Sequence, residues 1–98
     1  MPNIRIRFHP AAAAEVEAAV QWYAERSPVA ARAFALEVNA CVERVGEAPD
    51  RWPRYVHGTR RYLLPHFPFS LVYRVRNDDL EIVAVAHHRR RPGYWRGR

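Results

Sequence analysis

The residues best suited to chemistry lie together at the carboxyl end of the chain, in the segment 84–98. The segment is AVAHHRRRPGYWRGR, so two histidines, a run of arginines and two aromatic residues follow a short hydrophobic stretch. Guanidinium groups form paired hydrogen bonds to phosphate and carboxylate oxygens, and aromatic rings stack on bases or fill apolar pockets. This combination predicts a binding surface for a polyanion or for an acidic protein partner.

The charge of the whole chain favours the same kinds of partner. Sixteen basic residues, all arginines, stand against ten acidic residues, which gives a formal net charge of +6. Most of the arginines lie after residue 50. This asymmetry favours association with nucleic acid, an acidic partner or an anionic surface, although it carries no information about the fold. A GC-rich coding bias accounts for arginine in place of lysine, but not for the clustering.

Length and composition are typical of one small globular domain. A chain of 98 residues, 49% of them hydrophobic, builds one core of modest size. No segment has the length and hydrophobicity of a membrane span, and no secretory signal is visible. Cys41 is the only cysteine in the sequence, so no disulfide or thiolate cluster forms within the chain. We expect one cytoplasmic domain over 1–98, with a basic tail at 88–98 and no cofactor or metal.

Hydrophobic periodicity and turn residues predict the elements that position this segment. The alternation of apolar and charged residues in 4–8 predicts a short strand, after which Pro10 opens a helix. Ser27 and Pro28 supply the N-cap and first turn of a second helix. Gly46 is well placed as the C-cap of that helix. These elements predict a helical hairpin that follows a strand.

The second half of the chain has the pattern of a β-meander. Residues 48–59 contain two prolines and a glycine, which predict a loop. Strands are predicted over 60–64, 69–76 and 80–87, with 77–79 as the turn between the last two. The order β-α-α-β-β-β predicts an α+β domain in which the helical hairpin packs on one face of a small, curved, mainly antiparallel sheet.

Alternation within the strand 69–76 divides its side chains between two faces. The apolar residues predicted to face the helices are Phe69, Leu71, Tyr73 and Val75. The other face carries Ser70, Arg74 and Arg76, and Arg61 and His87 can join them at the ends of neighbouring strands. Because the helices cover only one face, we expect this second face to be a basic concave surface that meets solvent or a ligand.

Several short motifs, taken together, resemble a known family. They are Trp22-Tyr23, Pro49 with Trp52-Pro53, Arg61, FPFSLVYR at 67–74 and AVAHHRRRPGYW at 84–95. Their order and spacing resemble the ParE/RelE toxin superfamily of type II toxin–antitoxin modules, over nearly the whole chain and in its ParE-like branch most closely. The resemblance implies the same fold, a helical hairpin on a curved antiparallel sheet.

The resemblance to RelE-like members implies one possible activity, ribosome-dependent cleavage of mRNA. That reaction needs a base for the attacking hydroxyl, an acid for the leaving oxygen and cations around the phosphate. Leu63 and Ser70 stand where RelE-like toxins place cations, which weakens this interpretation. A divergent catalytic set remains available: Arg61, Arg74, His88 and Tyr94.

The resemblance to ParE-like members implies a different activity, inhibition of DNA gyrase by binding alone. We therefore expect a non-enzymatic gyrase inhibitor that forms a hetero-oligomer with an acidic cognate antitoxin. An endonuclease that acts on mRNA at the ribosome is the alternative, and a plain nucleic-acid-binding module is a third possibility. The residues expected to meet the target or the antitoxin are Arg61, Arg74, His87, Arg89, Arg90, Tyr94 and Trp95. Trp95 is expected to be exposed and to fill a partner's pocket.

Overall fold

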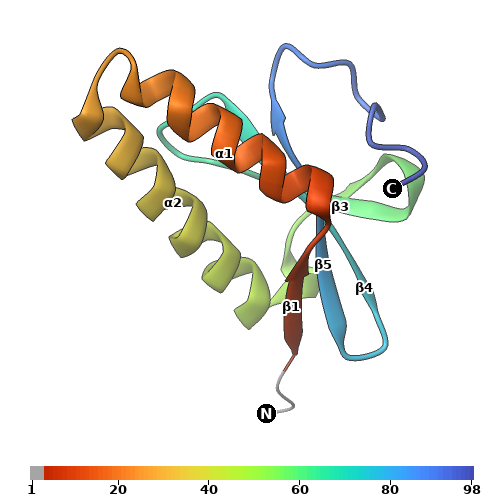
Figure 1. Ribbon diagram of the computed structural model, residues 1–98. Coiled ribbons are helices and arrows are strands. Elements are labelled where there is room, and N and C mark those ends of the chain that lie inside the picture. Colours follow the sequence, from red (N-terminus) through yellow and green to blue (C-terminus); the bar gives the residue numbers. More distant parts are fainter. Residues whose placement is uncertain (1–3) are drawn as a thin grey trace.

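The computed structural model describes residues 4–98 as a helical hairpin packed on a five-stranded sheet (Figure 1). The two helices are α1 (Pro10–Ala24) and α2 (Pro28–Glu47). The strands are β1 (Arg5–Phe8), β2 (Arg54–Tyr55), β3 (Thr59–Leu63), β4 (Phe69–Arg76) and β5 (Asp79–His87). Their order in the sheet is β1-β5-β4-β3-β2, with β1 parallel to β5 and the other pairs antiparallel. The predicted α+β class and helical hairpin are confirmed.

Both helices begin at the residues that the sequence indicates. The Nδ1 atom of His9 accepts a hydrogen bond from the backbone N–H of Ala11 at 3.0 Å, which caps α1. The hydroxyl of Ser27 accepts a hydrogen bond from the N–H of Ala30 at 3.2 Å, which caps α2. Each cap satisfies a backbone donor that lacks a partner within the helix, and a proline occupies the first turn in both cases.

Two expectations about the end of the hairpin are wrong. The helix α2 runs through Gly46 to Glu47, and Pro49 then opens a 3-10 turn because proline cannot continue the α-helical hydrogen bonding. Gly46 has a packing role instead, since a Cβ atom there would lie 2.8 Å from Cδ1 of Ile6 on β1. The segment 48–59 is also more than a loop, because it contains the short edge strand β2, which pairs with β3.

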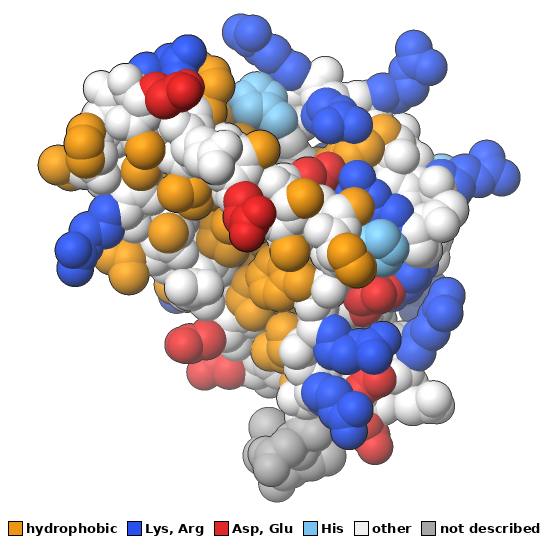
Figure 2. All heavy atoms as spheres, viewed as in Figure 1, with side chains coloured by type: hydrophobic (Ala, Val, Ile, Leu, Met, Phe, Trp, Pro, Cys, Tyr) orange, Lys and Arg blue, Asp and Glu red, His pale blue; other side chains and the backbone are white. Residues whose placement is uncertain are grey.

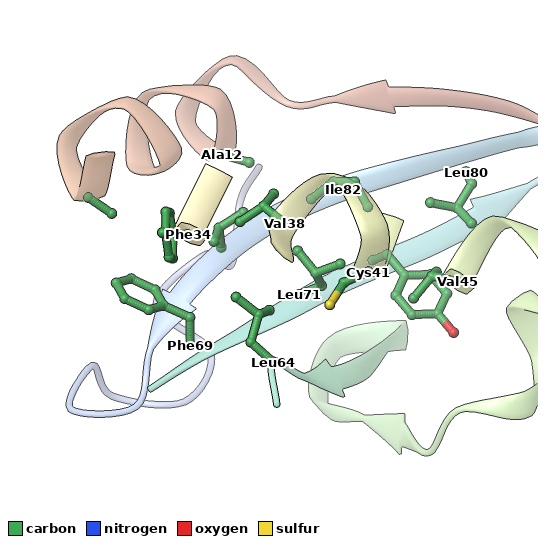
Figure 3. Close-up of a cluster of buried hydrophobic side chains, with 13 residues drawn as sticks. Ala12, Phe34, Val38, Cys41, Val45, Leu64, Phe69, Leu71, Leu80 and Ile82 are labelled. Carbon is green, nitrogen blue, oxygen red and sulfur yellow. The ribbon is translucent and has the colours of Figure 1, made fainter. Parts of the chain in front are cut away.

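The main core lies between α2 and the sheet (Figure 3). The inward-facing residues of α2 recur every three or four positions and are Phe34, Val38, Cys41 and Val45. They pack on Phe69, Leu71 and Tyr73 of β4, as predicted, and the ring centroids of Phe34 and Phe69 are 5.0 Å apart. Val75 does not belong to this core and is 40% exposed. The turn between β4 and β5 projects beyond the end of α2 (Figure 1).

A β-bulge in β5 creates a second hydrophobic cluster. Val72 pairs with Ala84 while Tyr73 pairs with Ile82, so Val83 is an extra residue on β5. Val83 and Ala84 are consecutive, yet both belong to the cluster that packs with the tail. A regular strand would have placed them on opposite faces. The bulge therefore adds apolar area to the face of the sheet that the helices leave uncovered.

The C-terminal tail, residues 88–98, covers part of this second face, and in Figure 1 it returns past the β2 end of the sheet. Trp95 is only 3% exposed, and the centroid of its ring lies 5.5 Å from the centroid of the Tyr55 ring. The expectation of an exposed Trp95 is therefore wrong. The physical reason is that the apolar residues at the bulge are buried by the chain's own indole ring.

Candidate functional site

The carboxylate of Glu15, on α1, fastens the tail to the body of the domain. It accepts hydrogen bonds from the Tyr94 hydroxyl at 2.6 Å and from the Arg98 guanidinium at 3.0 and 3.1 Å. It also accepts the backbone N–H of Val85 at 3.0 Å. The last residue pair between β1 and β5 is Phe8 with Ile82, so β1 does not reach Val85. At Val85 the Glu15 carboxylate accepts the backbone hydrogen bond that a neighbouring strand would otherwise accept. Sequence reasoning missed this residue, because nothing in the helical pattern separates it from Glu17, the other glutamate of α1.

Two of the expected site residues, Tyr94 and Arg74, form contacts with Glu15 or with the tail. Burial raises the pKa of Tyr94 far above its usual range, and the hydrogen bond to Glu15 raises it further. The Arg74 guanidinium forms a 2.7 Å salt bridge with Glu81 and donates a hydrogen bond to the carbonyl of Arg98 at 2.8 Å. Both side chains therefore have structural partners inside the folded chain.

Other expected residues meet in a cavity of about 250 Å³ on the second face of the sheet, which we call the basic pocket. It lies between strands β2–β5 and the tail, and its lining residues are Tyr55, Arg61, Leu63, Ser70, Val72, Ala86, His87, His88, Arg90, Pro92 and Trp95. No carboxylate is among them. Of the residues expected to bind a target or antitoxin, Arg61, His87, Arg90 and Trp95 are brought together here.

The two arginines of the basic pocket are held by aromatic rings. The Arg61 guanidinium lies 4.3 Å from the centre of the Tyr55 ring, and that of Arg90 lies 3.8 Å from the centre of the Tyr94 ring. Within residues 4–98 neither arginine forms a salt bridge, in contrast to Arg74. Stacking orients a guanidinium without neutralising it, so both positive charges remain available to a ligand.

The histidines of the pocket have different surroundings. The Nε2 atom of His88 lies 3.1 Å from the hydroxyl oxygen of Ser70. The residue Ser70 is 3% exposed. His87 packs edge-on against Phe69, with ring centroids 5.0 Å apart. Burial lowers the pKa of His87, and the neighbouring charges of Arg89 and His88 lower it further. His88 is thus the histidine that is hydrogen-bonded to a polar side chain of the pocket.

A second and larger depression, the apolar groove, runs between α1 and β5 and has a volume of about 620 Å³. Its lining residues are Glu15, Ala18, Ala19, Trp22, Tyr23, Pro68, Phe69, Val85, His87, Arg89, Arg90 and Tyr94. Trp22 is 51% exposed, with the guanidinium of Arg26 stacked 3.7 Å from its ring centre. Arg89 and Tyr94, two more of the expected binding residues, lie along this groove.

The charge on the surface is unevenly distributed. Figure 2 shows arginine side chains gathered over the sheet and the tail, whereas hydrophobic side chains are frequent over the helical hairpin. Within residues 4–98, no group of three or more His, Cys, Asp or Glu side chains could hold a metal ion. In the same residues no helix has the length and hydrophobicity needed to cross a membrane. The unpaired arginines of the basic pocket are suited to the recognition of negative charge.

The helical hairpin on a mixed sheet, with a basic second face partly covered by an aromatic tail, is the fold that the resemblance to ParE-like toxins implies. Residues 6–92 match the family described as "ParE toxin of type II toxin-antitoxin system, parDE". The chain belongs to this family of ParE toxins. Membership implies an antitoxin as a partner.

Individual relatives agree with this assignment. Toxin ParE2 of Mycobacterium tuberculosis, in strains CDC 1551 / Oshkosh and ATCC 25618 / H37Rv, is 30% identical over 90 residues, which cover 90% of this chain and 85% of the relative. The solved structure titled "Chromosomal ParDE TA system from P. aeruginosa" superposes with a TM-score of 0.79 at 21% sequence identity, over 89% of this chain and 98% of that chain. The structural likeness shows a shared fold.

Proposed function

We propose that this ParE-type toxin acts in the cytoplasm as an inhibitor of DNA gyrase, by binding and without chemistry of its own. The observation that supports binding over catalysis is the separation of the candidate catalytic residues. Arg61 and His88 line the basic pocket, whereas Arg74 is paired with Glu81. Tyr94 donates its hydroxyl proton to Glu15. Cleavage of a phosphodiester requires base, acid and cations to converge on one phosphate, and Arg74 and Tyr94 are not among the residues that line the pocket with Arg61 and His88.

We further propose that the cognate antitoxin neutralises the toxin by covering the tail and the apolar groove. Arg89 and Arg90 place positive charge at the groove, beside the half-exposed ring of Trp22. An acidic segment with apolar side chains matches both features of this surface. A segment that folds on binding suits a long groove, because it trades ordering entropy for a large contact area.

A paired assay tests the proposed activity. Purified toxin is added to gyrase with relaxed plasmid DNA, and separately to a translating system with a defined mRNA. We expect supercoiling to stop and cleaved DNA to accumulate, while the mRNA stays intact. Addition of the antitoxin should restore supercoiling, which shows that the inhibition is specific to the toxin. Unimpaired supercoiling at every toxin concentration contradicts the proposal.

The alternative, an mRNA endonuclease that acts at the ribosome, is favoured by one specific observation. Ser70, Arg61 and His88 share the basic pocket, where a phosphate could meet a cation and a proton donor together. Cleavage at A-site codons that disappears with both His88→Ala and Tyr94→Phe would replace the gyrase proposal with this one. A chain that binds naked nucleic acid but affects neither system would support the third possibility, a simple binding module.

A further inference from the structure

We propose that the exposed face of α2 is a docking surface for the α2 helix of a second copy of this chain, in antiparallel orientation. The apolar residues of this face are Val29, Ala33, Leu36 and Ala40, and we call them the outer ridge. They follow one another at intervals of four, three and four positions, so they form a single stripe along the helix. The apolar groove assigned to the antitoxin is lined by no residue of α2, so the outer ridge is a separate surface.

The outer ridge stands opposite the side of α2 that enters the core. Val29 is 79% exposed and Leu36 is 59% exposed, whereas Phe34 and Val38 of the same helix are buried. In Figure 1, α2 lies on the side of the domain opposite the tail. A helix with a second apolar stripe in contact with water gains stability when another surface covers that stripe.

Charged residues beside the outer ridge favour a second copy as its occupant. Arg32 lies beside the amino-terminal half of the stripe, and Glu43 continues the stripe toward the carboxyl end of α2. Both residues are exposed, and within residues 4–98 neither forms a salt bridge. When two α2 helices lie antiparallel with Leu36 near the centre, Arg32 of each copy faces Glu43 of the other copy. The surface is therefore self-complementary in charge, as a two-fold interface requires.

The shape of the outer ridge and the ends of the helix favour the same arrangement. The small side chains of Ala33 and Ala40 allow two helices to approach closely, while Leu36 fills the space between them. A helix carries partial positive charge at its amino end and partial negative charge at its carboxyl end, so antiparallel helices bring opposite charges together.

The size of the outer ridge predicts a weak, reversible dimer. The stripe from Val29 to Ala40 occupies about 17 Å of helix. A stable interface buries roughly 800 Å² on each partner, which is more than one short helical face provides. Because the antitoxin groove contains no residue of α2, the dimer and the toxin–antitoxin complex can form together.

Sedimentation velocity of the full chain, at concentrations from about 1 µM to about 1 mM, tests for this dimer. We expect the mass to rise from that of a monomer toward that of a dimer. Leu36→Glu should raise the dissociation constant at least about tenfold, because it places a carboxylate at the centre of the contact. Val75→Glu is the matched control, since Val75 is 40% exposed near the end of β4 and should leave the dimer unchanged. A monomer at every concentration, or an equal loss with both variants, overturns the proposal.

Charge reversal tests the antiparallel arrangement. Arg32→Glu and Glu43→Arg should each weaken self-association about tenfold, because each variant places like charges together twice in a symmetric dimer. An equimolar mixture of the two variants should associate as strongly as the wild-type chain, since every facing pair in the mixed dimer again has opposite charges. A mixture that associates as weakly as the single variants overturns the proposal.

Titration with the antitoxin separates the outer ridge from the surface assigned to the antitoxin. Leu36→Glu should bind the antitoxin with the affinity of the wild-type chain. If Leu36→Glu weakens antitoxin binding and the free wild-type chain stays monomeric, the outer ridge is an antitoxin contact and the proposal fails. Neither measurement contains gyrase, so a failure of the gyrase proposal leaves the dimer unaffected.

Discussion

Removal of the Glu15 carboxylate should destabilise this toxin more than any other substitution of an acidic residue on α1. The carboxylate receives the Tyr94 hydroxyl, the Arg98 guanidinium and the backbone N–H of Val85, at distances from 2.6 to 3.1 Å. The side chains of Glu15 and Arg98 are 16% and 19% exposed, so water replaces little of what is lost. Glu15→Ala leaves three donors without their acceptor.

The magnitude follows from the burial of these groups. Breaking a buried ion pair by removing one partner costs about 3 to 5 kcal/mol, because the remaining charge stays desolvated. Arg98 has a second acceptor, the carbonyl of Val83 at 3.0 Å, which reduces the loss. We therefore expect the free energy of unfolding to fall by about 3 kcal/mol, a large fraction of the roughly 5 to 15 kcal/mol that stabilises a natural domain.

Urea unfolding followed by circular dichroism measures this loss, and tryptophan fluorescence reports on the tail through Trp95. Glu17→Ala is the matched control, since Glu17 is an exposed glutamate on the same helix and should change stability by less than about 0.5 kcal/mol. Glu15→Gln preserves the shape but not the charge and should fall between the two. Equal unfolding midpoints for Glu15→Ala and Glu17→Ala would refute the role assigned to the network.

Three further predictions concern the core, the tyrosines and the antitoxin. Phe34→Ala should lower the free energy of unfolding by about 3 to 5 kcal/mol, because the ring is fully buried; an unchanged thermal transition would contradict the packing. The pKa of Tyr73 is raised by burial to about 12 and that of Tyr94 is also raised, from a usual value of 10.0, so the folded state holds phenol protons more tightly than the unfolded state. Stability should therefore fall as the pH rises above 10.0, and a thermal midpoint that stays constant through this range would refute the linkage. The combined variant Arg89→Ala, Arg90→Ala should slow association with the antitoxin and weaken its salt dependence, whereas unchanged kinetics in a titration at two salt concentrations would place the interface elsewhere.

Local structure followed from the sequence because it depends on neighbouring residues. Ser27 and Pro28 set the start of α2 through a cap and a restricted backbone angle, both of which are visible within a few positions. The alternation in 69–76 correctly predicted which face of β4 enters the core, up to Tyr73. Gly46 shows where this reasoning fails, since α2 continues through it and its contact with Ile6 of β1 is not visible in the local sequence.

The composition of the site was decided only by contacts between distant parts of the chain. Arg61 and Arg90 come together because the side chain of Arg61 on β3 points to the face of the sheet that the tail covers, and no local sequence pattern indicates this contact. The family resemblance indicated that the tail carries function, but it did not indicate that Trp95 of the tail is buried against the sheet.

Sequence alone therefore determined most of the secondary structure, the fold class and the family of this toxin, whereas tertiary structure decided which polar groups are paired within the fold. The Tyr94 hydroxyl donates its hydrogen bond to Glu15, which lies 79 residues earlier in the chain. The bulge at Val83 then gives the second face the apolar surface that buries the tail. Periodicity reports only the burial of each residue relative to its neighbours, and hydrogen bonds across the fold depend on distances that exist only after the chain has folded.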